Sequence, residues 1–134
     1  MKVIFTCGGT AGHVNPALAL AGYMRKQDPT VEILFVGTPN GIERGLVAEA
    51  GYDYRGIEVG SFERSMDLDS LRHNAKSAVE LLTLRRRAQA ILREFPADLV
   101  VGTGGYASYP MVKYAALQGI PTAGREGDMI PGLS

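Results

Sequence analysis

Short apolar runs alternate along the chain with longer segments in which apolar residues recur every three or four positions. The runs Val3–Cys7, Ile33–Val36 and Asp98–Val101 each end at a glycine, as is typical of a buried strand followed by a tight turn. Two further strands are predicted over Tyr54–Val59 and Ile120–Ala123. The pattern therefore predicts five short strands.

The segments between these strands have the periodicity of helices. A first helix is expected to open at Pro16, where the missing N–H costs nothing, and to extend to about Gln27. A second helix is predicted over Ile42–Ala50, and Gly51 stands where a C-terminal cap is expected.

The second half of the chain continues the alternation. A long helix is predicted over Leu71–Phe95 and a shorter one over Tyr109–Gln118, which Gly119 caps. Strands that alternate with helices in this way imply an α/β fold, with a Rossmann-like parallel sheet and helices on both faces. The 134 residues suit one domain. Because Pro131–Ser134 has the pattern of a helix start, we expect this domain to be incomplete at its C-terminal end.

Composition narrows the class of protein. The formal net charge is zero, so no overall field points to a nucleic-acid partner. Cys7 is the only cysteine, which excludes a disulfide framework and a cysteine zinc site and makes a reduced, cytoplasmic compartment the default expectation. No stretch approaches the roughly 18 apolar residues that span a bilayer. Any contact with a membrane is therefore expected to be peripheral.

A glycine-rich loop, Gly8–His13, follows the first predicted strand. Glycines let the backbone approach a ligand closely, and a helix N-terminus favours an anion, most obviously a diphosphate. A tight turn without a ligand accounts for the glycines equally well. The loop lacks the G-x-G-x-x-G spacing, and Val36-Gly37-Thr38 at the end of the second strand has no carboxylate for a ribose. Both observations argue against a nicotinamide cofactor.

His13 is the candidate catalyst of this loop. A lone histidine is more often a satisfied structural group than a catalyst. Here it follows a candidate anion loop and precedes a predicted helix, so a neutral imidazole could take a proton from an attacking hydroxyl. The position therefore favours a catalytic role over a structural one.

Three motifs give the chain a family resemblance. The segment Gly8–Ala19 resembles the first signature of the family 28 glycosyltransferases, which have the GT-B fold. The segment Val101–Pro110 is similar to the second glycine-rich loop of that family. A third match is Gly119–Pro121 followed by Pro131–Leu133. The three motifs occur in the family's order and the resemblance covers the whole chain.

The resemblance implies an inverting transfer of N-acetylglucosamine that uses neither a metal nor another cofactor. The donor would be UDP-N-acetylglucosamine, and the acceptor N-acetylmuramoyl-pentapeptide linked to undecaprenyl diphosphate, at the cytoplasmic face of the bacterial membrane. Residues 1–134 would form the acceptor-binding N-terminal half of a GT-B enzyme. Because the donor-binding C-terminal domain lies outside this chain, the chain alone is expected to be inactive.

The resemblance also implies roles for individual residues. His13 would be the general base, and Glu126 would belong to the catalytic machinery. The implied donor contacts are Thr10, Ala11, Gly12 and Asp128. The implied contacts with the acceptor diphosphate are Gly9, Asn15, Gly104, Gly105, Tyr106 and Ser108. For Tyr106, stacking on a sugar and wedging the loop are equally good interpretations.

One segment departs from the family pattern. The family usually has a His-Glu pair followed two residues later by Asn, whereas this chain has Arg125-Glu126-Gly127-Asp128. An ionised Asp only accepts hydrogen bonds, while Asn both donates and accepts. Asp128 would therefore add repulsion beside a diphosphate donor.

The long predicted helix is basic. Its candidate membrane patch consists of Arg72, Lys76, Arg85, Arg86 and Arg87. Most charge runs are simply solvated helix faces. With a lipid-linked acceptor implied, and with Leu68, Leu71, Val79 and Leu82 near the charges, peripheral contact with an anionic membrane surface is favoured.

Two other functions are compatible with the sequence. One is a non-catalytic subunit of a split glycosyltransferase, which anchors the acceptor or the membrane while another chain brings the donor. The other is a Rossmann-like nucleotide-binding module without transfer activity. A nucleotide-sugar domain encoded downstream in the same chain would favour the enzyme over the split subunit. Binding to a lipid diphosphate but not to free nucleotide would argue against the nucleotide-binding module.

Overall fold

The computed structural model describes residues 1–8, 11–58, 75–104 and 108–124. The strands are β1 (Lys2–Thr6), β2 (Glu32–Gly37), β3 (Asp53–Gly56), β4 (Leu99–Gly102) and β5 (Thr122–Gly124). The helices in the described ranges are α1 (Ala11–Gln27), α2 (Ile42–Glu49), α4 (Ala75–Glu94) and α5 (Ser108–Leu117). Strands and helices follow one another along the chain, as their sequence periodicity predicts.

The five strands form one parallel sheet in the order β3-β2-β1-β4-β5. Strand β1 lies at its centre, with Phe5 opposite Phe35 of β2 on one side and Val101 of β4 on the other. The chain builds the sheet outward to β3 and then returns to the opposite side of β1. The predicted parallel sheet is therefore confirmed.

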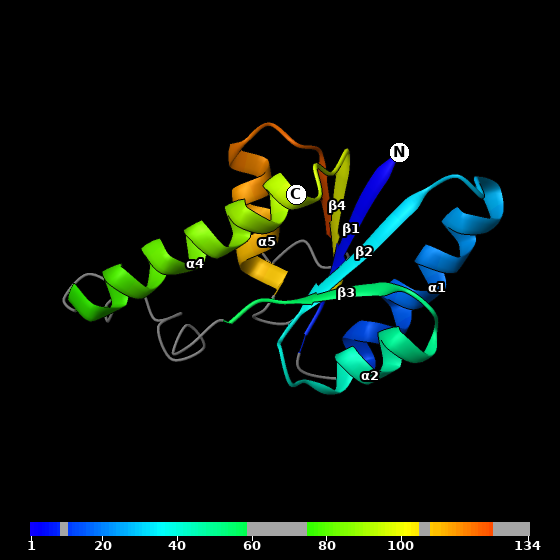
Figure 1. The fold of residues 1–134 in the computed structure, drawn as a ribbon, viewed down its shortest axis with the longest axis horizontal. Coiled ribbons are helices and arrows are strands. Elements are labelled where there is room, and N and C mark those ends of the chain that lie inside the picture. The colour runs from blue at the N-terminus through cyan, green and yellow to red at the C-terminus, as the bar shows by residue number, and fades with distance from the viewer. Residues whose placement is uncertain (9–10, 59–74, 105–107, 125–134) are drawn as a thin grey trace.

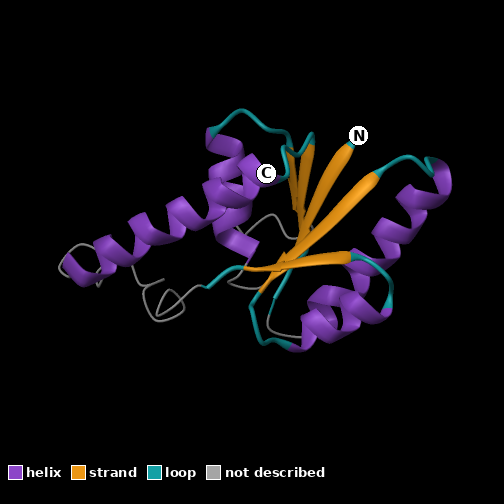
Figure 2. Cartoon of the chain, viewed as in Figure 1, coloured by secondary structure: helices purple, strands orange, loops and turns teal. Residues whose placement is uncertain are grey.

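Helices cover both faces of this sheet (Figures 1 and 2). Alternate residues of β1 point to opposite faces: Val3 and Phe5 pack with α1 and α2, whereas Ile4 packs with α4 and α5. A parallel strand that is buried on both faces is apolar along its length, and this explains the unbroken apolar run at the start of the chain. The predicted three-layer arrangement is confirmed.

Helix α1 begins earlier than predicted. It starts at Ala11, so Pro16 lies inside the helix and does not open it. Pro16 has no N–H to donate to the carbonyl of Gly12, which costs one hydrogen bond near the helix start. The helix still extends upstream because Val14 and Ala17, three positions apart, are both fully buried on the same core face. Tertiary packing thus overrides the proline signal.

The other boundaries agree with the predictions to within a few residues. Strand β3 ends at Gly56, and Val59 of the predicted strand lies outside the described residues. The two predicted glycine caps are confirmed, because Gly51 and Gly119 both have positive φ angles, 87° and 81°. Each follows the end of a helix, α2 or α5, where a left-handed residue satisfies terminal carbonyls.

The cap at Gly119 can be tested against a helical glycine. A Cβ atom would meet nothing within 4 Å at either Gly119 or Gly45, so substitution by alanine changes only the backbone preference. Gly119→Ala should lower the free energy of unfolding by about 1–2 kcal/mol, because the left-handed conformation is strained for alanine. Gly45→Ala, inside α2, should raise it by about 0.5–1 kcal/mol. Urea unfolding of the two variants measures both effects, and a Gly119→Ala protein as stable as wild type would contradict the assignment.

Candidate active site

Two glycine-containing turns meet at the carboxyl ends of the central strands β1 and β4. The strand order reverses between these two strands, since β2 and β3 lie on one side and β5 lies on the other. Open α/β sheets bind ligands in the crevice at such a reversal. Gly8 follows β1, Gly104 comes two residues after β4, and both are buried. The fold therefore brings the two predicted loops to the edge of the sheet where a ligand is expected.

His13 lies between these two turns, in the first turn of α1. Its Nδ1 is 3.1 Å from the carbonyl oxygen of Gly8. The opposite edge of the ring packs on Gly104, where a Cβ atom would lie 2.6 Å from Cδ2 and 2.9 Å from Nε2 of His13. Gly104 also has a φ of 123°, which side-chain-bearing residues rarely adopt. Both the backbone and the neighbouring imidazole thus require glycine at position 104.

The contact with Gly8 indicates the tautomer of the imidazole. A carbonyl oxygen only accepts hydrogen bonds, so Nδ1 of a neutral His13 carries the proton and donates it. The lone pair then lies on Nε2, beside Gly104. A ring that is oriented through Nδ1 and accepts a proton at Nε2 has the geometry that general-base catalysis needs.

Two hydroxyl groups tie the second turn to its surroundings. Thr103 Oγ1 donates to the carbonyl oxygen of His13 at 2.5 Å, and the Thr103 N–H donates to Thr6 at 3.1 Å. Ser108 Oγ lies 2.8 Å from the carbonyl oxygen of Thr6 and 2.7 Å from that of Gly104. Both side chains are buried. The turn after β4 is therefore fastened both to β1 and to α1.

The structure brings only some of the predicted site residues together. Gly104 contacts both Ser108 and the ring of His13, while Gly12, which directly precedes His13, and Asn15 are exposed on α1. Outside the described residues lie Gly9, Thr10, Gly105, Tyr106, Glu126, Asp128 and the side chain of Ala11. Among the described residues, no three His, Cys, Asp or Glu side chains gather where they could hold a metal ion.

A buried carboxylate that sequence reasoning missed lies under the turn after β2. Glu43 of α2 is fully buried, and its Oε1 accepts from the backbone N–H of Thr38 at 2.8 Å and from the Thr38 hydroxyl. Tyr54 of β3 donates its hydroxyl to the Thr38 carbonyl at 2.6 Å. The second oxygen, Glu43 Oε2, has no hydrogen-bond partner in the described part of the chain. This turn is thus built around one carboxylate, at the same sheet edge as the glycine turns.

The buried carboxylate changes the ionisation of its neighbours. Burial raises the pKa of the Cys7 thiol to about 12, and the charge of Glu43 adds to the rise. Burial and Glu43 also raise the pKa of Tyr54. Both groups are therefore uncharged at neutral pH, and Cys7 is not an activated nucleophile.

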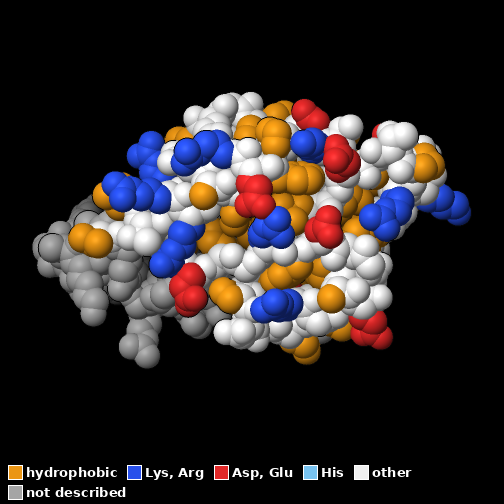
Figure 3. Space-filling model, in the orientation of Figure 1, with side chains coloured by type: hydrophobic (Ala, Val, Ile, Leu, Met, Phe, Trp, Pro, Cys, Tyr) orange, Lys and Arg blue, Asp and Glu red, His pale blue; other side chains and the backbone are white. Residues whose placement is uncertain are grey.

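Helix α4 carries Lys76, Arg85, Arg86 and Arg87 of the predicted membrane patch. Leu84, Ala88 and Ile91 bury one face of the helix, while Val79 and Leu82 remain 62% and 52% exposed. Figure 3 shows Lys and Arg side chains gathered over α4 with hydrophobic side chains among them. No helix within the described ranges is long and apolar enough to cross a bilayer.

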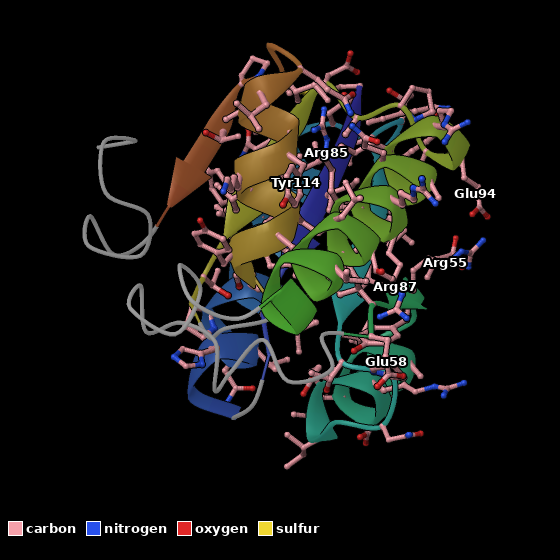
Figure 4. All side chains as sticks on the ribbon, turned by 90° about the vertical axis from the view of Figure 1, so that its left-hand side faces the viewer. Arg55, Glu58, Arg85, Arg87, Glu94 and Tyr114 are labelled. Carbon is pink, nitrogen blue, oxygen red and sulfur yellow. The ribbon has the colours of Figure 1, made fainter. Side chains whose placement is uncertain are left out.

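The basic residues of α4 differ in their surroundings. Arg85 and Arg86 are exposed. Arg87 is exposed but directed toward the end of β3, where its Nη1 donates to the carbonyl oxygen of Glu58 at 2.7 Å (Figure 4). Arg72 and the side chain of Lys76 lie outside the described residues. Arg87 therefore makes a hydrogen bond within the domain. The exposed side chains of Leu82, Arg85 and Arg86 remain the described candidates for contact with a membrane.

The sheet order and the paired glycine turns define a Rossmann-like domain of the kind that forms the N-terminal half of GT-B glycosyltransferases. Comparison with known families agrees. Residues 3–134 match the glycosyltransferase family 28 N-terminal domain, and the chain belongs to this family. The resemblance predicted from the three motifs is thus confirmed.

Individual relatives support the same family assignment. The chain is 44% and 43% identical, over all 134 residues, to the UDP-N-acetylglucosamine--N-acetylmuramyl-(pentapeptide) pyrophosphoryl-undecaprenol N-acetylglucosamine transferases of Halothermothrix orenii and of Thermoanaerobacter sp. strain X514. It covers 34% and 36% of them, so the chain spans about a third of the length of these curated relatives. Among solved structures, Acinetobacter baumannii MurG is similar with a TM-score of 0.73 and 28% identity, over 92% of this chain and 34% of that one.

Alkaline pH should reveal the buried thiol. An ordinary thiol ionises near pH 9.0, as in the unfolded chain, whereas folded Cys7 keeps its proton until about pH 12. The folded state binds more protons in this window, so the contribution of Cys7 to the free energy of unfolding is complete below pH 9.0 and declines as the pH rises toward 12. The slope approaches about 1.4 kcal/mol per pH unit. Urea unfolding as a function of pH should show a shallower decline for Cys7→Ala, and equal slopes would contradict the assignment.

Proposed function

We propose that the protein containing this chain transfers N-acetylglucosamine from UDP-N-acetylglucosamine to N-acetylmuramoyl-pentapeptide on undecaprenyl diphosphate, a step of peptidoglycan biosynthesis. Residues 1–134 form its acceptor-binding N-terminal domain. The observation that carries the proposal is the position of His13 between the two glycine turns, in a family 28 domain. The relatives that are 43–44% identical bear the name of this reaction. A second domain outside this chain binds the uridine diphosphate.

His13 acts as the general base. The acceptor hydroxyl attacks the anomeric carbon of N-acetylglucosamine, the bond to UDP breaks, and the configuration inverts. Nε2 of His13 takes the hydroxyl proton, while Nδ1 remains bonded to the Gly8 carbonyl. The bond to Gly8 favours this division of roles, because it leaves Nε2 as the basic nitrogen.

The glycine turns hold the two diphosphates. The contacts proposed for the acceptor diphosphate are Gly9, Asn15, Gly104, Gly105, Tyr106 and Ser108. Because the Ser108 hydroxyl lies against backbone carbonyls, the group that Ser108 offers is its backbone N–H at the start of α5. The contacts proposed for the donor are Thr10, Ala11, Gly12 and Asp128, with Glu126 in the catalytic machinery. Backbone N–H groups and helix N-termini neutralise diphosphate charge in this arrangement without a metal ion.

The basic helix brings the enzyme to its lipid substrate. Arg72, Lys76, Arg85, Arg86 and Arg87 form the proposed patch, and it contacts an anionic surface at the cytoplasmic face of the membrane. The exposed side chains of Val79 and Leu82 support this contact, since an interfacial helix binds through apolar area as well as charge. The protein is thus a peripheral membrane enzyme.

Replacing His13 tests the base. In the complete enzyme, His13→Ala should lower kcat by about 10²–10⁴-fold, with little change in the KM for the donor, because a general base acts in the transition state. His73→Ala, at the only other histidine of this chain, is the matched control. Transfer of labelled sugar measures kcat, and circular dichroism checks the fold. A folded His13→Ala enzyme with kcat within about threefold of wild type would exclude His13 as the base.

The membrane patch is tested by charge removal. Arg85→Gln/Arg86→Gln should weaken binding to phosphatidylglycerol vesicles by about 1 kcal/mol per charge, or roughly 30-fold for the pair. Adding Arg87→Gln should weaken it further. Arg25→Gln/Lys26→Gln removes the same charge from α1, on the other face of the sheet, and should have little effect. If co-sedimentation shows equal binding for the two double variants, α4 is a solvated helix face.

A further inference from the structure

We propose that Thr103 is a positioning residue for His13, through the hydrogen bond from its hydroxyl to the backbone of α1. The inference rests on the function proposed above, in which Nε2 of His13 takes the acceptor proton. Thr103 touches neither substrate in this scheme. It fixes the position of the His13 backbone, and through it the position of the imidazole.

Thr103 is anchored at both its backbone and its side chain. Its N–H donates to the Thr6 carbonyl at 3.1 Å, which continues the β1–β4 ladder one residue past Gly102. Its hydroxyl donates to the carbonyl oxygen of His13 at 2.5 Å, across 90 positions of the sequence. The residue is only 3% exposed, so water does not compete for either bond. Thr103 therefore links the centre of the sheet to the start of α1.

The acceptor of this bond is the backbone carbonyl of His13 itself, so the bond can influence where the imidazole lies. The first four N–H groups of a helix have no partner within it, and its first turn is therefore its least constrained part. His13 lies in that turn of α1. Its carbonyl also accepts the helix's own hydrogen bond, and its second lone pair remains for Thr103. A bond to the carbonyl fixes the backbone from which the ring projects.

The surroundings of the ring leave little room for movement. Nδ1 of His13 bonds Gly8, on the β1 side, and the Cδ2–Nε2 edge rests on Gly104, on the β4 side. Helix α1 packs against β1 and α2, and the hydroxyl of Thr103 adds a hydrogen bond from its first turn to the β4 side. If the first turn moved away from β4, the ring would leave Gly104 and Nε2 would change direction. A displacement of about 1 Å in a reacting group can cost on the order of a hundredfold in rate.

Two substitutions separate the hydroxyl from the shape of the side chain. Thr103→Val keeps the branched Cβ and removes the donor, whereas Thr103→Ser keeps the donor and removes the methyl group. In the complete enzyme, Thr103→Val should lower kcat by about 10- to 100-fold and leave both KM values within about twofold. Thr103→Ser should restore most of kcat. A structural role alone predicts instead that activity falls with the fraction of folded protein, at constant kcat per folded molecule.

A second measurement follows the ring directly. In the complete enzyme, histidine-selective ¹⁵N labelling gives a set of ring signals for each histidine, and the set that a His13→Gln variant lacks belongs to His13. The wild-type enzyme should show the Nδ1–H tautomer of His13, because Nδ1 bonds the Gly8 carbonyl, and Thr103→Val should shift the His13 signals toward a mixture of tautomers. Thr103→Ser should resemble wild type.

The two measurements distinguish every outcome. If wild type transfers no sugar, the proposed function fails, while the spectra still decide whether Thr103 orients His13. A fall in kcat without a change in the His13 signals would overturn the inference, because Thr103 would then act by another route. A changed spectrum with unchanged kcat would overturn it as well, because the orientation of the ring would not limit the reaction.

Discussion

The parallel pairing of β1 with β4 is the constraint on which the candidate site depends. It places the turns after these strands side by side, although they are separated by more than 90 residues of sequence. The N–H of Thr103 extends the ladder beyond the last paired residue of β4, and the hydroxyl of Ser108 returns to the carbonyl of Thr6. With both turns fixed to β1, the carbonyl of Gly8 and the open face of Gly104 enclose one imidazole. A change of register at this strand pair would separate them.

Most of the fold could be predicted from the sequence because its main determinants are periodic. Strands buried on both faces give unbroken apolar runs, and the helices that cover them give spacings of three and four. Glycines at helix ends were informative, since Gly51 and Gly119 both adopt the left-handed conformation. The start of α1 was predicted wrongly because the burial of Val14 is a tertiary effect, and a local rule for Pro16 does not contain it.

The candidate site was only partly predictable, for a similar reason. His13 and Gly104 lie in motifs whose residue types and order resemble a known family. By contrast, Thr103 and Glu43 act through contacts that depend on how separate turns meet, and neither lies in a local pattern that predicts its partner. The hydroxyl of Ser108 faces backbone carbonyls, an orientation that its place in a glycine-rich loop does not predict.

The carboxylate of Glu43 restricts how this sequence can diverge. A methyl group at Gly41 would collide with the Thr38 hydroxyl and with both carboxylate oxygens, whereas one at Gly37 would lie 2.5 Å from the Tyr54 hydroxyl and 2.8 Å from both the Cys7 carbonyl oxygen and Cγ of Glu43. Conversely, loss of the carboxylate alone would leave the N–H and hydroxyl of Thr38 without their acceptor. Gly41 and Glu43 are therefore epistatic, because the effect of replacing one depends on what occupies the other, whereas the Cys7 carbonyl and the Tyr54 hydroxyl also require glycine at position 37. Evolutionary change in the turn after β2 is therefore expected to replace these residues together. Mutagenesis of one position at a time will underestimate the range of sequences that this turn can accept.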